Sequence, residues 1–144
     1  MPGVFDKYGL RFLFPDNWTV EADEDRRGQP AVSAYSPGGA FWTVVLQPAE
    51  SEPTELAKVA LATMRQEYEE LDSESVREKV GQTELVGFDV NFYCLDLTNT
   101  AWIRAVKTDL ATYLILCQAE DREFGEVAHV FRAMTVSLLG ATSG

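Results

Sequence analysis

Residues 84–118 have the sequence ELVGFDVNFYCLDLTNTAWIRAVKTDLATYLILCQ. In its first part Phe88, Val90 and Phe92 alternate with polar residues, which is the pattern of a strand with one buried face. Two further runs rich in β-branched and aromatic residues follow after short polar breaks. The stretch therefore predicts three long strands at 84–97, 101–108 and 111–118, joined by Thr98-Asn99 and Asp109-Leu110. Connections this short predict an antiparallel meander.

The last of these strands is apolar on both faces, because Leu114 and Leu116 lie opposite Tyr113, Ile115 and Cys117. Such a strand is typical of the centre of a sheet that is covered on both sides. Two segments with apolar residues at helical spacing, 53–71 and 121–138, could supply the cover. Their apolar stripes consist of Leu56, Val59, Ala60, Met64, Tyr68 and Leu71 in the first, and Phe124, Val127, Ala128, Phe131, Met134 and Leu138 in the second. We therefore expect an α+β fold.

Shorter elements are predicted in the rest of the chain. Ser36-Pro37-Gly38-Gly39 suits a hairpin turn between strands at 31–35 and 41–46. Further strands are expected at 10–14, 18–21 and, as a charged edge strand, 76–80. Ser51 and Asp121 are the expected helix N-caps. The polar stretches 22–30 and 140–144 predict a mobile loop and a disordered tail.

Composition and charge restrict the classes of partner. The chain has 144 residues and no internal repeat or linker, so we expect a single domain over 1–144. Its formal net charge of −11 repels the phosphates of nucleic acid and of anionic membranes, so neither is expected as a partner. The N-terminus has no basic start followed by an apolar run, and no stretch is long and apolar enough for a membrane helix. We therefore expect a cytoplasmic protein.

The stretch Tyr8-Gly-Leu-Arg-Phe-Leu-Phe-Pro-Asp-Asn-Trp18 resembles the opening strand, proline turn and tryptophan of the PsbP-like group of domains. This group includes the photosystem II extrinsic protein PsbP and a Ran-binding nuclear import factor. Phe131-Arg-Ala-Met-Thr-Val-Ser137 is similar to its closing helix, and the expected element order matches over nearly the whole chain. The resemblance implies an α-β-α sandwich with a long antiparallel sheet of about seven or eight strands and two main helices. It implies binding, assembly or chaperone-like roles and transfers no functional residue to this chain.

The residue types needed for common catalytic and metal sites are scarce. His129 is the only histidine, and Cys94 and Cys117 are isolated from each other, so no zinc ligand set is expected. Both cysteines fall in strand patterns and are expected to be reduced core residues, whereas His129 lies off the apolar stripe of its helix. No nucleophile elbow or phosphate-binding loop occurs. We therefore expect a protein that is not an enzyme and uses no cofactor.

Acidic residues and one tryptophan are the candidate partner-binding residues. Five carboxylates crowd the end of the first predicted helix and the loop beyond it: Glu67, Glu69, Glu70, Asp72 and Glu74. Carboxylates at a helix C-terminus oppose the helix dipole, a local cost that a basic partner would offset. Glu21, Asp23, Glu24 and Asp25 are a second acidic group that could contribute to the same surface. Trp102 shares a strand face with the charged Arg104, so this tryptophan could be partly exposed. An exposed tryptophan could anchor a partner.

Two functional hypotheses follow. The first is a non-enzymatic protein-binding, assembly or chaperone-like domain whose partner has a basic surface. The alternative is a small-molecule-binding domain, or an enzyme whose site is built from dispersed residues. A flat sheet face with an acidic rim would favour the first hypothesis, and a closed apolar pocket with converging polar groups the second. The sequence leaves the oligomeric state open.

Overall fold

The computed structural model describes residues 2–24 and 28–142. In chain order its elements are β1 (Gly3–Lys7), β2 (Leu10–Phe14), β3 (Thr19–Glu24), β4 (Pro30–Tyr35), β5 (Phe41–Gln47), α1 (Pro53–Glu67), β6 (Leu71–Val80), β7 (Thr83–Cys94), β8 (Leu97–Lys107), β9 (Thr112–Glu120) and α2 (Asp121–Thr142). Within the described part, seven strands form one antiparallel sheet in the order β3-β4-β5-β9-β8-β7-β6, and β1 pairs with β2. The predicted α+β class and the β7-β8-β9 meander are confirmed.

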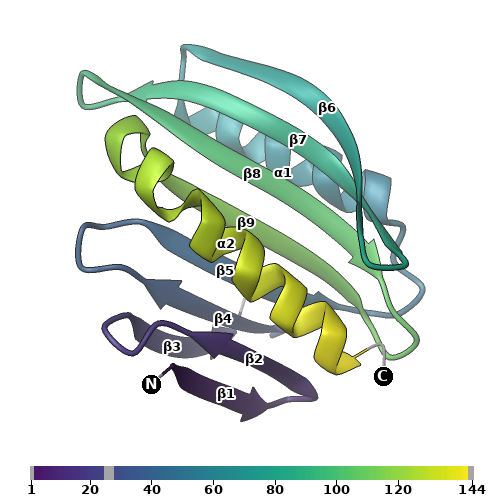
Figure 1. Ribbon diagram of the computed structural model, residues 1–144. Coiled ribbons are helices and arrows are strands. Elements are labelled where there is room, and N and C mark those ends of the chain that lie inside the picture. The colour runs from purple at the N-terminus through teal and green to yellow at the C-terminus, as the bar shows by residue number, and fades with distance from the viewer. Residues whose placement is uncertain (1, 25–27, 143–144) are drawn as a thin grey trace.

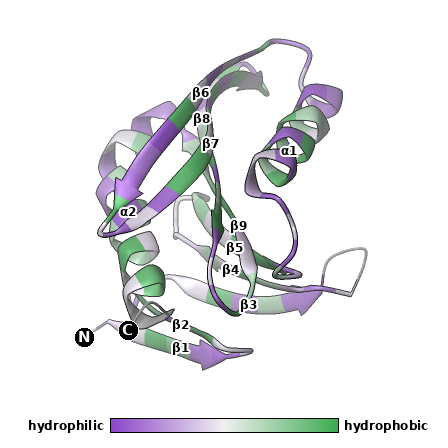
Figure 2. Cartoon of the chain, turned by 90° about the vertical axis from the view of Figure 1, so that its right-hand side faces the viewer, coloured by the Kyte–Doolittle hydropathy of each residue, from purple (hydrophilic) through white to green (hydrophobic). Residues whose placement is uncertain are grey.

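The two helices lie on opposite faces of the sheet, α2 in front and α1 behind in Figure 1. Strand β9 is buried on both faces as expected, because Ile115 packs in the core under α2 while Leu116 packs against the core under α1. The core under α2 also takes in the β1-β2 hairpin, whose Phe12 ring lies 4.7 Å from that of Trp42. Figure 2 shows the sheet edge-on between the helices. The arrangement is the predicted α-β-α sandwich, extended by a hairpin that the sequence analysis did not predict.

The first helix is shorter than predicted. It ends at Glu67, and Tyr68 is already extended, with its ring 4.3 Å from that of Phe92 on β7. The apolar residue Leu71, expected on the helix, begins strand β6 and pairs with Phe92. Strand β6 therefore pairs with β7 over ten residues, where a last helical turn and a short strand at 76–80 were expected.

The N-caps of both helices and the apolar face of α1 also differ from expectation. The N-cap of α1 is Glu52, whose side chain accepts from the Glu55 N–H at 2.9 Å, and not Ser51. On α1 the predicted stripe residue Val59 is exposed, while Ala57 and Leu61 are buried. At the start of α2 the carboxylate of Glu120 accepts from the N–H groups of Arg122 and Glu123, the role expected of Asp121. Asp121 instead accepts a hydrogen bond from Thr100 on β8.

Two connections and the C-terminal segment differ from the prediction. The β7-β8 turn is Leu95-Asp96, both with positive φ, so Thr98-Asn99 belongs to β8. Part of the expected loop at 22–30 is strand: residues 22–24 continue β3 and Pro30 begins β4, while 25–27 lie outside the described residues. Helix α2 continues through 140–142, where a disordered tail was expected, and 143–144 lie outside the described residues.

Candidate functional site

The structure separates the two acidic groups that the sequence analysis considered together. Glu67 is the last residue of α1, Glu69 and Glu70 lie in the connection to β6, and Asp72 and Glu74 are on β6 itself. The second group, Glu21, Asp23 and Glu24, is on β3, and Asp25 lies outside the described residues. Strands β6 and β3 are the two opposite edges of the seven-stranded sheet. With neighbouring strands about 4.8 Å apart, the two groups cannot form one surface.

The carboxylates of Asp72 and Glu74 face the α2 side of the sheet. The register pairs Asp72 with Asn91 and Glu74 with Asp89, and the next strand contributes Thr100 opposite Asn91. Helix α2 packs on β2, β8 and β9, so it leaves this part of the same face uncovered. The result is a polar half-face of the sheet, which we call the acidic half-face: Asp72, Glu74, Asp89, Asn91 and Thr100.

A buried arginine joins the acidic half-face to α2. Arg104 on β8 has only 6% of its side chain exposed, and its Nε donates to Oε1 of Glu78 on β6 at 2.6 Å. Its Nη2 donates to Asp89 at 2.7 Å, and its Nη1 donates to the backbone carbonyls of Phe88 and Ile103. Arg132 on α2 donates to the second oxygen of Glu78 at 3.1 Å. Arg104 and Arg132 therefore both pair with Glu78, and the pair with Arg132 attaches α2 to the edge strand β6.

The charge of Glu78 follows from this arrangement. Burial by itself would raise its pKa, but hydrogen bonds and the charges of Arg104 and Arg132 together hold the pKa below the usual glutamate value. Glu78 is thus an ionised structural partner rather than a general acid.

Gly87 lies between Val76 and Arg104 in the register, and a Cβ there would overlap the carbonyl oxygen of Ile103. Glycine is needed for this close approach of β7 to β8.

Trp102 sits beside this cluster on β8 and is partly buried, whereas Trp18 and Trp42 are buried. The guanidinium carbons of Arg104 and Arg132 lie 5.6 and 5.3 Å from the centre of its ring, within reach of cation–π attraction. Its ring also meets Phe124 of α2 edge-on at 4.9 Å. Trp102 is thus partly exposed, a position that its shared face with Arg104 had left open, and most of its ring contacts are to residues of α2.

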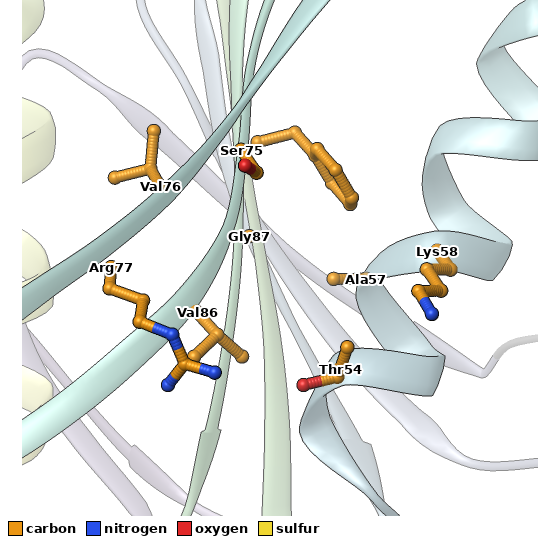
Figure 3. Close-up of a pocket in the computed structure, with 9 residues that line it drawn as sticks. Thr54, Ala57, Lys58, Ser75, Val76, Arg77, Val86 and Gly87 are labelled. Carbon is orange, nitrogen blue, oxygen red and sulfur yellow. The ribbon is translucent and has the colours of Figure 1, made fainter.

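A cleft opens on the other side of the sheet, between the first turns of α1 and strands β6 and β7 (Figure 3). It has a volume of about 520 Å³. Ala57, Val86 and Phe88 give it apolar walls, and Lys58 and Arg77 stand at its sides. Both cations have carboxylate neighbours: Lys58 lies 3.7 Å from Glu55, and Arg77 lies 2.7 Å from Glu84.

The two cysteines and the histidine lie in different parts of the fold. Cys117 is buried in the core under α2, and burial raises the pKa of its thiol far above the usual range, so it stays protonated. His129 is exposed on α2, and Cys94 is partly buried in the other core. Among the described residues there is no group of three or more His, Cys, Asp or Glu that could hold a metal ion.

None of the helices described is long and apolar enough to cross a membrane.

Sequence reasoning missed Glu78 and Asp89 as partners of a buried arginine. The available signal was Arg104 itself, a single charge within the apolar run Ala101-Trp-Ile-Arg-Ala-Val106. An arginine in a strand of this kind needs carboxylate partners. The cleft gave no signal, because its walls come from three segments that are far apart in the chain.

Comparisons with known proteins support the fold and do not extend to function. No model of a protein family matches the chain, and no curated protein sequence does. The solution structure of cyanobacterial PsbP from Synechocystis sp. PCC 6803 is similar with a TM-score of 0.59 at 13% identity, covering 95% of this chain and 89% of that one. The crystal structure of PA94, a protein of unknown function from Pseudomonas aeruginosa, is similar with a TM-score of 0.56 at 8% identity, covering 95% of each chain. The chain therefore has a PsbP-like fold, as the resemblance implied.

Proposed function

We propose that this chain is a non-enzymatic protein-binding domain, with an assembly or chaperone-like role, that holds a basic surface of its partner on the acidic half-face. The observation that carries the proposal is the pairing of Glu74 with Asp89 across β6 and β7. Like charges directly opposite each other in a sheet are destabilising, and here they lie on a part of the sheet that α2 does not cover. A lysine or arginine from a partner would remove this repulsion.

The neighbouring charges support the same proposal. Glu69 and Glu70 are exposed in the connection that leads into β6, next to Asp72. Together with the net charge of −11, they give this edge a field that attracts basic groups over a distance. The second acidic group on β3 is too far away to share a small partner, so we assign it no part in this contact.

Affinity capture with paired variants tests the proposal. The variant D72K/E74K reverses the charge of the acidic half-face, and E21K/E24K makes the same change in charge on the exposed strand β3. Proteins that the wild type captures at low salt should not be captured by D72K/E74K, nor by the wild type at high salt. The E21K/E24K variant should still capture them at low salt. Capture that is unaffected by D72K/E74K, or that disappears equally with both variants, would contradict the proposal.

Binding of a small molecule is a second candidate function, which the cleft beside α1 favours. Its volume is in the usual range for ligand sites, and its apolar walls with flanking cations suit a small carboxylate with an apolar tail. Octanoate is a suitable probe. We expect it to shift the NMR signals of Ala57, Val86 and Phe88 and to bind less well to V86D, and unchanged signals at millimolar octanoate would exclude this class of ligand.

A further inference from the structure

The outer edge of β6 is open to pairing. Strand β6 is the last in the order of the sheet, and among the described residues no other strand pairs with its outer side. It is ten residues long, about 33 Å at the usual rise per residue. Edge strands of this kind present a row of free N–H and C=O groups to which an extended segment can add.

The charges of β6 are divided between its two faces. Side chains alternate, so the α2 side carries Asp72, Glu74, Val76, Glu78 and Val80, and the α1 side carries Leu71, Ser73, Ser75, Arg77 and Lys79. All the carboxylates of the strand are therefore on the α2 side. From Leu71 to Ser75 the α1 side carries no charge. Charged side chains on an edge strand hinder pairing, and on the α1 side of β6 they are confined to Arg77 and Lys79.

The cleft lies where the α1-side residues of an added strand would project. The C-terminal part of α1 is tied to β6 by a hydrogen bond from Arg65 to Ser73 at 2.9 Å. Near its N-terminus the helix stands away from the strand, and Ser75 forms part of the wall of the space between them (Figure 3). Beyond Ser75 the walls are the apolar side chains of Ala57 and Phe88. An apolar side chain entering from the edge would be buried there.

We propose that β6 accepts an extended segment of a partner protein as an additional strand, and that this segment alternates basic with apolar residues. The basic residues lie on the α2 side beside Asp72 and Glu74, and the apolar residues enter the cleft on the α1 side. This inference rests on the proposed function, for which it names the class of partner and the way that it is held.

Peptides modified in the backbone test the proposal with the unaltered protein. The probe is a labelled ten-residue peptide of alternating lysine and valine. Two derivatives carry N-methyl groups on alternate residues, one set on the valines and the other on the lysines, so that each blocks hydrogen bonding along one edge while the charge is unchanged. Since only one edge of an added strand faces β6, we expect one derivative to bind at least tenfold more weakly and the other to bind as the parent does.

The outcomes separate this inference from the proposed function. Equal binding by both derivatives, lost with D72K/E74K, would overturn strand addition and leave the acidic half-face as a binding surface. Absence of any peptide binding at low salt would contradict both. A second variant, S75W, fills the mouth of the cleft from an exposed position. We expect it to weaken binding of the parent peptide at least fivefold, and unchanged binding would overturn the role of the cleft.

Discussion

Glu74 on β6 and Asp89 on β7 are register partners, so two carboxylates stand opposite each other on the α2 side of the sheet, in the part that the helix leaves uncovered. Asp89 also accepts a hydrogen bond from Arg104, whereas Glu74 is exposed on the edge strand. We expect the pair to lower the stability of the isolated chain, and the proposed function assigns the relief of this repulsion to a basic partner.

Replacing Glu74 by lysine should therefore stabilise the chain while removing partner binding. We expect E74K to raise the free energy of unfolding by about 0.5 kcal/mol, because the new cation faces Asp89. Urea denaturation measures the difference. The matched control is E21K on the other edge strand, where the register partner is Ser33. An E74K protein that is no more stable than E21K would show that the pair is not repulsive.

Arg104 should be the charged residue whose loss costs most stability. We expect R104M to lower the free energy of unfolding by about 3 kcal/mol, because two carboxylates and two backbone carbonyls lose their donor. The control is R122M, since the Arg122 side chain is 87% exposed and its ion pair contributes about 0.5 kcal/mol or less. A cost for R104M no larger than that for R122M, measured by denaturant unfolding, would contradict this account of the cluster.

The lowered pKa of Glu78 makes part of the stability depend on pH. A carboxylate with a pKa lower in the folded than in the unfolded chain contributes stability that is present above the unfolded value and is lost as the pH falls through the folded value. The stability difference between wild type and E78Q should therefore be largest near neutral pH and shrink below pH 4.5, the usual pKa of a glutamate. Denaturation curves at a series of pH values test this, and a constant difference down to acid pH would contradict it.

The turn between β7 and β8 contains a residue whose replacement should stabilise the chain. Leu95 has a φ of 53° and is 90% exposed, so it occupies the left-handed region with no packing to compensate. We expect L95N to raise the free energy of unfolding by about 0.5–1 kcal/mol, since asparagine tolerates this conformation. The control is L110N, another exposed leucine but without positive φ. Equal effects of the two substitutions on thermal unfolding would exclude backbone strain as the cause.

Trp102 should be the tryptophan most accessible to a quencher. Trp18 and Trp42 are buried, and Trp42 donates a hydrogen bond to Thr135 within the core. We expect acrylamide to quench a fraction of the wild-type fluorescence that is missing in W102F. If W102F is quenched to the same extent as the wild type, the exposed tryptophan lies elsewhere.

The sequence was most informative where one pattern covers a whole element. The alternation in residues 84–118 and the apolar stripe of α2 each depend on burial against a sheet, and both were confirmed. It was least informative where two patterns compete. Leu71 continues the helical spacing of α1 but is equally suited to a strand, and only its pairing with Phe92 decides between them. Leu95 is not a typical turn residue, so the β7-β8 turn was placed too late in the chain.

The candidate site depended on information that the sequence does not carry locally. The strand order puts the two acidic groups at opposite edges, and that order is set by pairings between segments far apart in the chain. Glu74 and Asp89 are fifteen positions apart and meet only because β6 and β7 form a hairpin. The sequence shows where the carboxylates are in the chain, but only the register of β6 and β7 shows which of them face each other.

The central claim is that basic segments bind at β6 and the acidic half-face, and NMR titration of the isotope-labelled chain with the lysine–valine peptide tests it most directly. We predict that the largest amide shifts occur in β6 and at Asp89 and Asn91 of β7, with little change in β3. Shifts concentrated in β3 or along the exposed side of α2 would contradict the claim.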